Sequence, residues 1–361
     1  MNIELMDLGV DEEELDELLA NKVGYKKQLS KIISKSRKDA KADKCLHCDK
    51  KVNSFCNSHS VPAFALRNIE VDGDVYFSNA LVEFPLMDNG DGVNRAGTFK
   101  IICRECDSKI FSAYENPDAY KEEATPVMMA QIAMKNHLKV ISKRLIEKGM
   151  YESIKEINPF NHEFVEHMHS VQDLDLNEAI KAYKRAKRAS EKGWGDEYYL
   201  FCYEKLNYVV PIAFQSSITL ITDLEGRIIN DIYNISEQYL TQDIEIAVFP
   251  LKESSVVIMF RDTNNNRYRK FCKMFKKLSI EEKLGIINYI IFLYSEDVFI
   301  SKAIPKEVLN DENLKDVAKQ TTMAMGMFPM MGDTIDKAVK VYNLNNWRSI
   351  PNLLSEGYRV R

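Results

Sequence analysis

The amino-acid sequence predicts an α+β protein in which N-terminal helices precede a cysteine-rich module, a helical connector and a C-terminal antiparallel sheet with flanking helices. Three observations predict this class: two Cys-x-x-Cys pairs, a helical period over residues 127–157, and β-rich runs after residue 197. They divide the chain into residues 1–43, 44–120, 121–196 and 197–361. A chain of 361 residues is long enough for several such parts to bury a core.

The first 43 residues are predicted to form two helices of opposite charge. Asp11 with Glu14 is typical of a capping box ahead of a short acidic helix, and a basic helix is expected over residues 25–42. Residues 1–18 contain eight acids and no base, whereas residues 22–51 contain eleven Lys or Arg and three Asp. This asymmetry indicates either a basic face beside the cysteine-rich module, covered by the acidic helix, or two solvated helices.

The elements of the remaining chain follow from hydrophobic period and turn signals. Apolar residues at three- and four-residue spacing predict helices over residues 127–157 and 177–192. Two further helices are expected over residues 268–277 and 280–294, the second capped by Ser279 and Glu282. β-rich runs bounded by turn residues predict the strands of the sheet, at residues 198–203, 208–214, 218–222, 227–232, 244–249 and 256–260.

The composition is that of a globular protein, with 45% hydrophobic and 29% charged residues. No apolar run approaches the roughly 18 residues that a membrane span requires, and the acidic start lacks the apolar region of a secretion signal. Seven cysteines, four of them at metal-binding spacing, fit a reducing compartment better than a disulfide framework. We therefore expect a cytoplasmic protein that does not enter a membrane.

The cysteine pairs are Cys45 with Cys48 and Cys103 with Cys106. Two such pairs can surround one tetrahedral ion with four thiolates, so their spacing predicts a closed structural zinc site. The alternative is four buried thiols without a metal. His59 lies in the segment that joins the two pairs.

These motifs resemble the zinc-supported HNH, or His-Me finger, endonucleases, in particular a group found in bacterial and phage-conflict genes. The matching residues are Cys45-Leu-His-Cys48, Ser58-His59-Ser-Val-Pro62 and Cys103-Arg-Glu-Cys106-Asp107, with Phe111 and Glu115 downstream. The resemblance implies a treble-clef-like ββα fold around zinc and the hydrolysis of phosphodiester bonds with magnesium or manganese. It implies His59 as the general base and Asp107 as a ligand of the catalytic metal. Glu115, expected on the same helical face as Asp107, is either a second ligand or a surface carboxylate.

The sequence departs from that family at two positions. Ser58 stands where the family commonly has Asp, Glu or His before the base, and Thr98 stands where it usually has Asn. Cys56 and His59, three residues apart, could also bind a metal themselves. Two functions stay open: a metal-dependent endonuclease, or a non-catalytic zinc protein that uses the module to recognise nucleic acid or protein.

Two basic stretches add to the expectation of a nucleic-acid partner, DNA or RNA. One covers residues 181–188 and the other residues 267–277. Either could contact phosphates, since affinity for nucleic acid grows with the number of phosphates neutralised. The alternative for each is a solvated face of an amphipathic helix. In the endonuclease hypothesis, the C-terminal domain would select the target or bind a protein partner.

Overall fold

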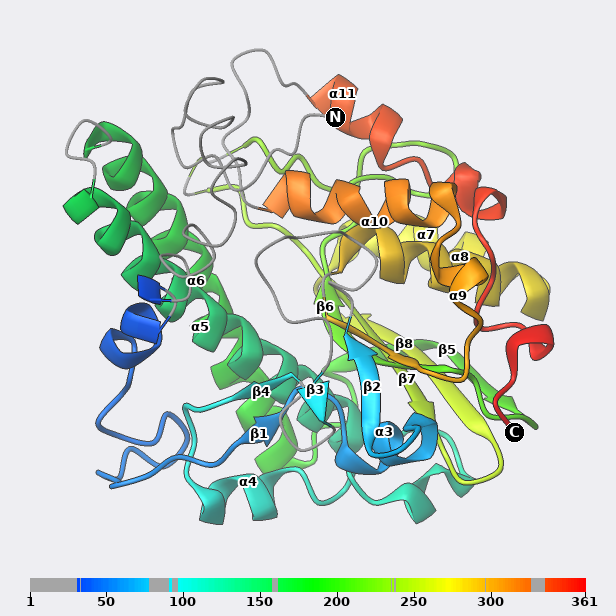
Figure 1. The fold of residues 1–361 in the computed structure, drawn as a ribbon, viewed down its shortest axis with the longest axis horizontal. Helices are drawn as coiled ribbons and strands as arrows, with labels where there is room; N and C mark the ends of the chain where they lie inside the picture. Colours follow the sequence, from blue (N-terminus) through cyan, green and yellow to red (C-terminus); the bar gives the residue numbers. More distant parts are fainter. Residues whose placement is uncertain are drawn as a thin grey trace.

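The computed structural model describes residues 31–32, 34–77, 91–92, 97–157, 162–234, 236, 238–295, 297–325 and 335–361. The described residues combine helices with antiparallel strands, so the α+β prediction is confirmed (Figure 1). Seven strands form the large sheet in the order β3-β2-β9-β6-β7-β8-β5, and β1 pairs with β4 apart from it. The predicted acidic helix lies outside the described residues. Of the predicted basic helix, residues 31–32 and 34–39 are helical.

The cysteine-rich module is built from short elements that surround the two cysteine pairs. Its strand β2 pairs with β9 (Val298–Ser301), with Val75 opposite Ser301, so this part of the chain extends the C-terminal sheet. The division into four domains stays a prediction. The module's described elements are β1 (Ser58–His59), α3 (Ala63–Ile69), β2 (Asp74–Phe77), β3 (Asp91–Gly92), β4 (Thr98–Phe99), α4 (Arg104–Ile110) and the 3-10 helix η2 (Pro117–Lys121).

Two long helices, α5 (Pro126–Ile157) and α6 (His162–Lys192), lie side by side and form the connector (Figure 1). The helix α5 begins one residue before its predicted start, whereas α6 begins well before the predicted residue 177. Ion pairs to α5 stabilise the additional turns: Lys148 Nζ lies 2.5 Å from Asp173, and Arg144 lies 3.0 Å from Asp175. Residues 162–176 also carry an apolar residue every three positions, at Val165, Met168, Val171 and Leu174, a helical period that the prediction from sequence did not use.

The large sheet is covered on both faces. On one face, Ile246 and Met259 belong to a core shared with helices α7 and α8; on the other, Phe249 and Ile258 pack with the module and the connector. Strands β7 and β8 are consequently buried along almost their whole length, Glu245 included, although their pairing is antiparallel. The strands that complete this sheet are β5 (Tyr198–Leu206), β6 (Ile212–Ile218), β7 (Ile244–Pro250) and β8 (Ser255–Asp262).

The helices that follow the strands lie together on the side of the sheet away from α3 and α4 (Figure 1). The helix α8 has its predicted bounds and its predicted capping box, in which Ser279 and Glu282 bond each other's backbone amides. These elements are η4 (Asn266–Tyr268), α7 (Arg269–Phe275), α8 (Ile280–Tyr294), α9 (Lys306–Leu309), α10 (Glu312–Met325), α11 (Ile335–Val341), η5 (Leu344–Ser349) and η6 (Glu356–Tyr358).

Three predicted strands differ from the structure. β6 begins at Ile212 rather than at residue 208, because the Val209 backbone pairs with the chain end: its amide donates to Arg361 and its carbonyl accepts from Val360, each at 2.9 Å. Of residues 218–222, Ile218 is the last residue of β6, whereas residues 219–222 and 227–232 lie in a loop beyond it, with one isolated bridge. There, the Asn230 side chain donates to the Leu220 carbonyl at 2.8 Å. Side-chain bonds thus replace the strand pairing that the pattern predicts.

Candidate metal centre

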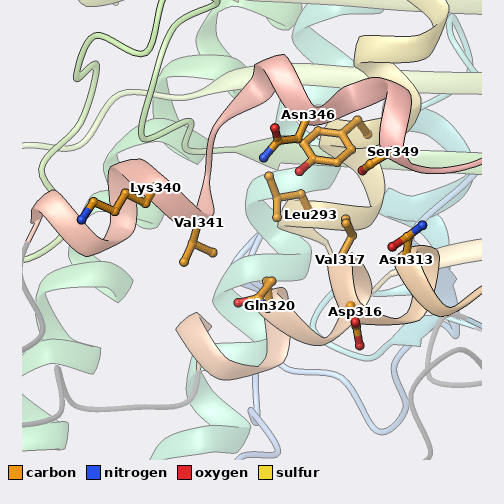
Figure 2. Close-up of a pocket in the computed structure, with 10 residues that line it drawn as sticks. Leu293, Asn313, Asp316, Val317, Gln320, Lys340, Val341, Asn346 and Ser349 are labelled. Atoms are coloured by element: carbon orange, nitrogen blue, oxygen red, sulfur yellow. The ribbon is translucent and has the colours of Figure 1, made fainter.

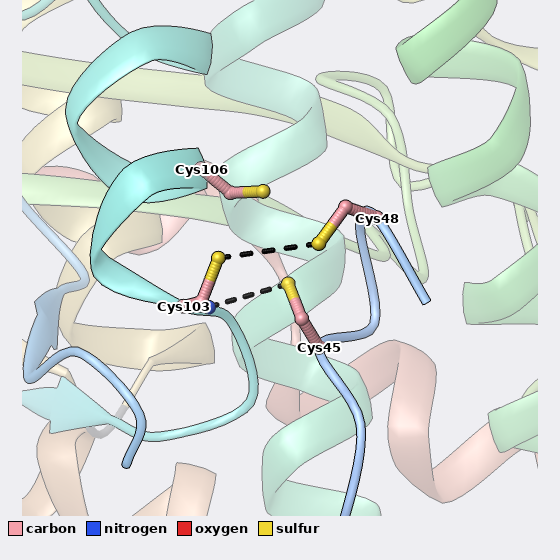
Figure 3. Close-up of side chains that lie close together, drawn as sticks. All are labelled: Cys45, Cys48, Cys103 and Cys106. Carbon is pink, nitrogen blue, oxygen red and sulfur yellow. Dashed lines mark hydrogen bonds between the residues drawn. The ribbon is translucent and has the colours of Figure 1, made fainter. Parts of the chain in front are cut away.

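The four predicted cysteines converge on one point. The sulfur atoms of Cys45, Cys48, Cys103 and Cys106 all lie within 4.8 Å of one another (Figure 3). Cys45 and Cys48 come from a turn closed by the Cys45 amide donating to the Lys50 carbonyl at 2.9 Å. Cys103 is the N-cap of α4 and Cys106 lies in that helix, so the two sulfurs project from one helix start. The geometry is that of a site able to hold a metal ion.

Hydrogen bonds prepare Cys45 for its thiolate form. Burial by itself raises the pKa of a thiol, but backbone amides of Cys48, Cys103 and His47 outweigh it and lower the pKa of Cys45 to about 7. The Cys103 amide donates to the Cys45 sulfur at 3.2 Å, as the dashed line in Figure 3 shows. Burial raises the pKa of Cys106. Sulfur ligands that accept backbone N–H bonds are suited to metal binding, because the metal requires thiolates.

The first cysteine turn is fastened to the connector. The His47 ring shares a 2.8 Å hydrogen bond with the Tyr183 hydroxyl, and Lys187 Nζ donates to the His47 carbonyl at 2.7 Å. In the same basic stretch, Arg185 pairs with Glu197 and, at 2.9 Å, with Asp262. Residues predicted as phosphate contacts therefore hold α6 to the cysteine centre and to the sheet.

A second cluster lies beside the metal centre and contains two of the predicted catalytic residues. Its centre is the ammonium of Lys135 on α5, whose side chain is 1% exposed. Lys135 Nζ lies 3.1 Å from Asp107 Oδ1, 3.1 Å from Glu115 Oε1 and 2.9 Å from Ser58 Oγ. It also lies 3.7 Å from the centroid of the buried Phe111 ring. We call Ser58, Asp107, Glu115 and Lys135 the lysine cluster.

Both oxygens of the Asp107 carboxylate have hydrogen-bond partners. The Ser58 hydroxyl donates to its Oδ1 at 2.5 Å and the Cys56 thiol donates to its Oδ2 at 3.4 Å. Burial raises the pKa of Asp107, but Lys135 and the Ser58 bond outweigh it, so the pKa lies below its ordinary value. For Glu115, burial prevails over the attraction of Lys135 and raises the pKa.

The structure places the predicted catalytic residues as follows. Asp107 and Glu115 meet at Lys135, although α4 ends at Ile110 and the two do not share one continuous helix as expected. The Glu115 amide donates to the Phe111 carbonyl at 3.0 Å, and this helical turn keeps Glu115 on the same side. His59 is half-buried in β1, opposite Thr98 of β4. Among the described residues, the four cysteines form the one group of three or more Cys, His, Asp or Glu close enough to share an ion.

Sequence reasoning did not identify Lys135. It lies three residues after Ile132 and three before Leu138, both fully buried, in a part of α5 where residues 128–138 are buried on every side. A lysine between two apolar residues of the helical period is the signal that could have identified it, because a buried ammonium requires carboxylate partners.

A hollow of about 310 Å³ lies on the far side of the sheet, where α8, α10, α11 and η5 meet (Figure 2). Asp316 and Lys340 are the charged groups in its lining, and its other side chains are apolar, amides or hydroxyls. It gathers no set of groups that suggests chemistry. Its lining consists of Tyr289, Leu293, Asn313, Asp316, Val317, Gln320, Lys340, Val341, Asn346 and Ser349.

Comparison of the chain with protein-family models, with curated proteins and with solved structures gave no match. The resemblance to HNH endonucleases therefore rests on the sequence motifs, and membership of that family stays a prediction. In the described part of the chain, no helix combines the length and apolarity needed to cross a membrane.

Proposed function

We propose that this chain is a non-catalytic binding protein whose four-cysteine centre holds a structural zinc ion. The observation that carries the proposal is Lys135, whose ammonium lies between the two carboxylates that would have to hold a catalytic cation.

The ligand set supports zinc. Four thiolates around one point suit Zn²⁺ or iron, whereas Mg²⁺ and Mn²⁺ prefer oxygen ligands. With all four positions taken by protein sulfur, such a centre has no open position for substrate. Cys45 is fully buried, and Cys103 and Cys106 are less than a tenth exposed, so the centre lies inside the fold. It would hold the turn at residues 45–48, the start of α4 and, through His47, the helix α6 together.

The lysine cluster argues against a divalent cation at Asp107. A cation there would lie within a few ångströms of a buried ammonium, and like charges repel strongly where water does not screen them. Lys135 already neutralises Asp107 and contributes to neutralising Glu115. The cluster therefore has the properties of a structural ion-pair network that ties α5 to the module.

The second candidate is the metal-dependent HNH-like endonuclease, acting on nucleic acid. One contact favours it: the Ser58 hydroxyl lies 2.5 Å from Asp107, so the residue next to His59 meets the residue after the last cysteine. In this candidate His59 would be the general base, and Asp107 with Glu115 would hold magnesium or manganese. The Asp107 and Glu115 side chains are 20% and 33% exposed, so solvent reaches both. Lys135 would have to leave or share the carboxylates.

Metal analysis and cleavage assays on one preparation separate the candidates. We expect one zinc per chain, and no cleavage of single- or double-stranded DNA or RNA with magnesium or manganese. The matched variant is His59→Ala, which keeps all four cysteines. Cleavage by the wild type that is lost in His59→Ala, at unchanged zinc content, would overturn the non-catalytic proposal in favour of the endonuclease. A preparation that folds without zinc or iron would overturn the structural role of the metal.

A further inference from the structure

The second basic stretch predicted from the sequence lines a hollow of about 390 Å³ on the α7 side of the sheet. Volumes of this size are typical of small-molecule sites. Helix α7 and the residues that follow it form one wall, and the neighbouring strands β5 and β8 contribute Tyr199 and Arg261. We call this the basic hollow. Its lining consists of Tyr199, Arg261, Arg269, Cys272, Lys273, Lys276 and Lys277.

Five of these side chains are cations, and no acid lines the hollow. Within the described part of the chain, none of the five forms an ion pair with a carboxylate. Nearby lysines outside the hollow do have such partners: Lys270 pairs with Glu225 at 2.6 Å and Lys283 with Glu204 at 2.7 Å. The gathered positive charge is therefore not balanced by the protein itself, and the cations repel one another until an anion binds.

Two of the cations have hydrogen-bond partners that orient them, Arg261 in a buried position and Lys276 in an exposed one. Arg261 is 7% exposed, and its guanidinium donates to the Asp262 and Thr263 carbonyls at 2.7 and 2.9 Å. Lys276 Nζ donates to the Tyr199 hydroxyl at 2.6 Å and lies 4.5 Å from the centroid of its ring. Fixing these groups before a ligand arrives lowers the entropy cost of binding it.

Helix capping explains only part of this arrangement. Cations near the C-terminus of a helix are favoured by its dipole, which accounts for Lys273, Lys276 and Lys277. Arg269 lies where η4 runs directly into α7, one helical turn before Lys273 and so on the same side of the helix. Arg261 belongs to a strand. Four exposed cations from one side of the helix and a buried arginine from the sheet thus line one volume, an arrangement suited to an anion of high charge.

We propose that the basic hollow binds the polyphosphate group of a small molecule, either a nucleoside di- or triphosphate or a condensed inorganic phosphate. Arg and Lys are the residues that bind phosphate oxygens by charge-assisted hydrogen bonds. A single concave volume fits a compact polyphosphate better than an extended nucleic-acid backbone, whose phosphates require a charged groove along several nucleotides. The site lies on the other face of the sheet from the cysteine centre, so it is independent of zinc and of the lysine cluster.

Calorimetric titration of the full chain with inorganic tripolyphosphate and with ATP, both without added metal, tests this inference. The test variant is Lys273→Gln/Lys277→Gln, and the control is Lys181→Gln/Lys184→Gln, which removes the same charge from exposed positions of α6. We expect at least one of the two ligands to bind. Its dissociation constant should rise by roughly tenfold or more in the test variant and stay nearly unchanged in the control.

The two ligands distinguish the source of the phosphate. Equal affinity for tripolyphosphate and ATP would assign the site to the phosphate chain alone, and clearly tighter ATP binding would assign it to a nucleotide. The inference is overturned if neither ligand binds, or if the control variant weakens binding as much as the test variant does. It is also overturned if a single-stranded oligonucleotide binds through these lysines while both small ligands fail. Nuclease activity would refute the non-catalytic proposal and leave this site untouched.

Discussion

The most informative single change in this protein is Lys135→Met. Methionine keeps the unbranched side chain that packs over Phe111 but removes the ammonium, so Asp107 and Glu115 lose their shared cation. Breaking a buried ion pair from one side costs about 3–5 kcal/mol, because it leaves an uncompensated charge. Asp107 and Glu115 are 20% and 33% exposed, and solvent screening places the expected loss near the lower end, about 3 kcal/mol.

That loss has a measurable thermal consequence. With an unfolding entropy of about 2.1 cal/mol/K per residue, a chain of 361 residues loses about 4 °C in Tm for a destabilisation of about 3 kcal/mol, if it unfolds cooperatively. The assay is urea unfolding followed by circular dichroism, with a thermal melt in parallel. The control is Lys148→Met on the same helix, whose partner Asp173 is 53% exposed; an exposed pair contributes at most about 1 kcal/mol.

The pH dependence gives a second measurement of the same interaction. Lys135 holds the pKa of Asp107 below its ordinary value, so the stabilisation it provides is present above that ordinary value and is lost as pH falls through the folded-state pKa. In Lys135→Met the unpaired carboxylates take up protons more readily. The difference in free energy of unfolding between wild type and variant should therefore become smaller between pH 7 and pH 4. This account of the lysine cluster would be refuted if Lys135→Met lost no more stability than Lys148→Met. It would also be refuted if the stability difference between Lys135→Met and the wild type did not change with pH.

Three further predictions concern other parts of the fold. Cys103→Ser should release the bound metal, as measured by elemental analysis, and should lower Tm, because a structural metal contributes folding free energy directly. The control is Cys202→Ser, which lies outside the metal centre and should keep the metal. Burial raises the pKa of Glu245 from 4.5 to about 7, so its contribution to stability is lost as pH rises through that window. Because Glu245→Gln does not ionise, its free energy of unfolding in urea should rise relative to the wild type by up to about 3 kcal/mol between pH 5 and pH 8. A difference that stays constant with pH would contradict this. Gly285→Ala should destabilise the protein by about 1–3 kcal/mol despite the better helix propensity of alanine, because the new Cβ would lie 2.2 Å from the Trp347 ring. Adding Trp347→Leu to this variant should recover part of the lost stability.

Local patterns predicted much of the fold and one of its two polar centres. The bounds of α8 follow from a capping box and an apolar period that both lie within a few residues of each other. The convergence of the four cysteines could be predicted in the same way. The two cysteines of each pair lie within one turn of the chain, and a four-sulfur metal site requires only that the two pairs come together. The start of α6 has an apolar period that the prediction did not use. The loop after β6 has a β-rich pattern, and the pattern does not reveal that the Asn230 side chain bonds the Leu220 carbonyl in place of a neighbouring strand.

The sequence by itself determined the fold class, the metal-binding cysteines and the residues that would carry catalysis if the module hydrolyses nucleic acid. Only the tertiary structure decided that Lys135, from a different helix, lies between Asp107 and Glu115 and neutralises charge there. It also decided that Arg185 and Lys187, from the first basic stretch, attach α6 to the sheet and to the cysteine turn. The second basic stretch instead lines a hollow together with Arg261. The physical reason is the same in each case. Periodicity reports which residues face inward, whereas the charge that a buried group meets depends on which elements pack together.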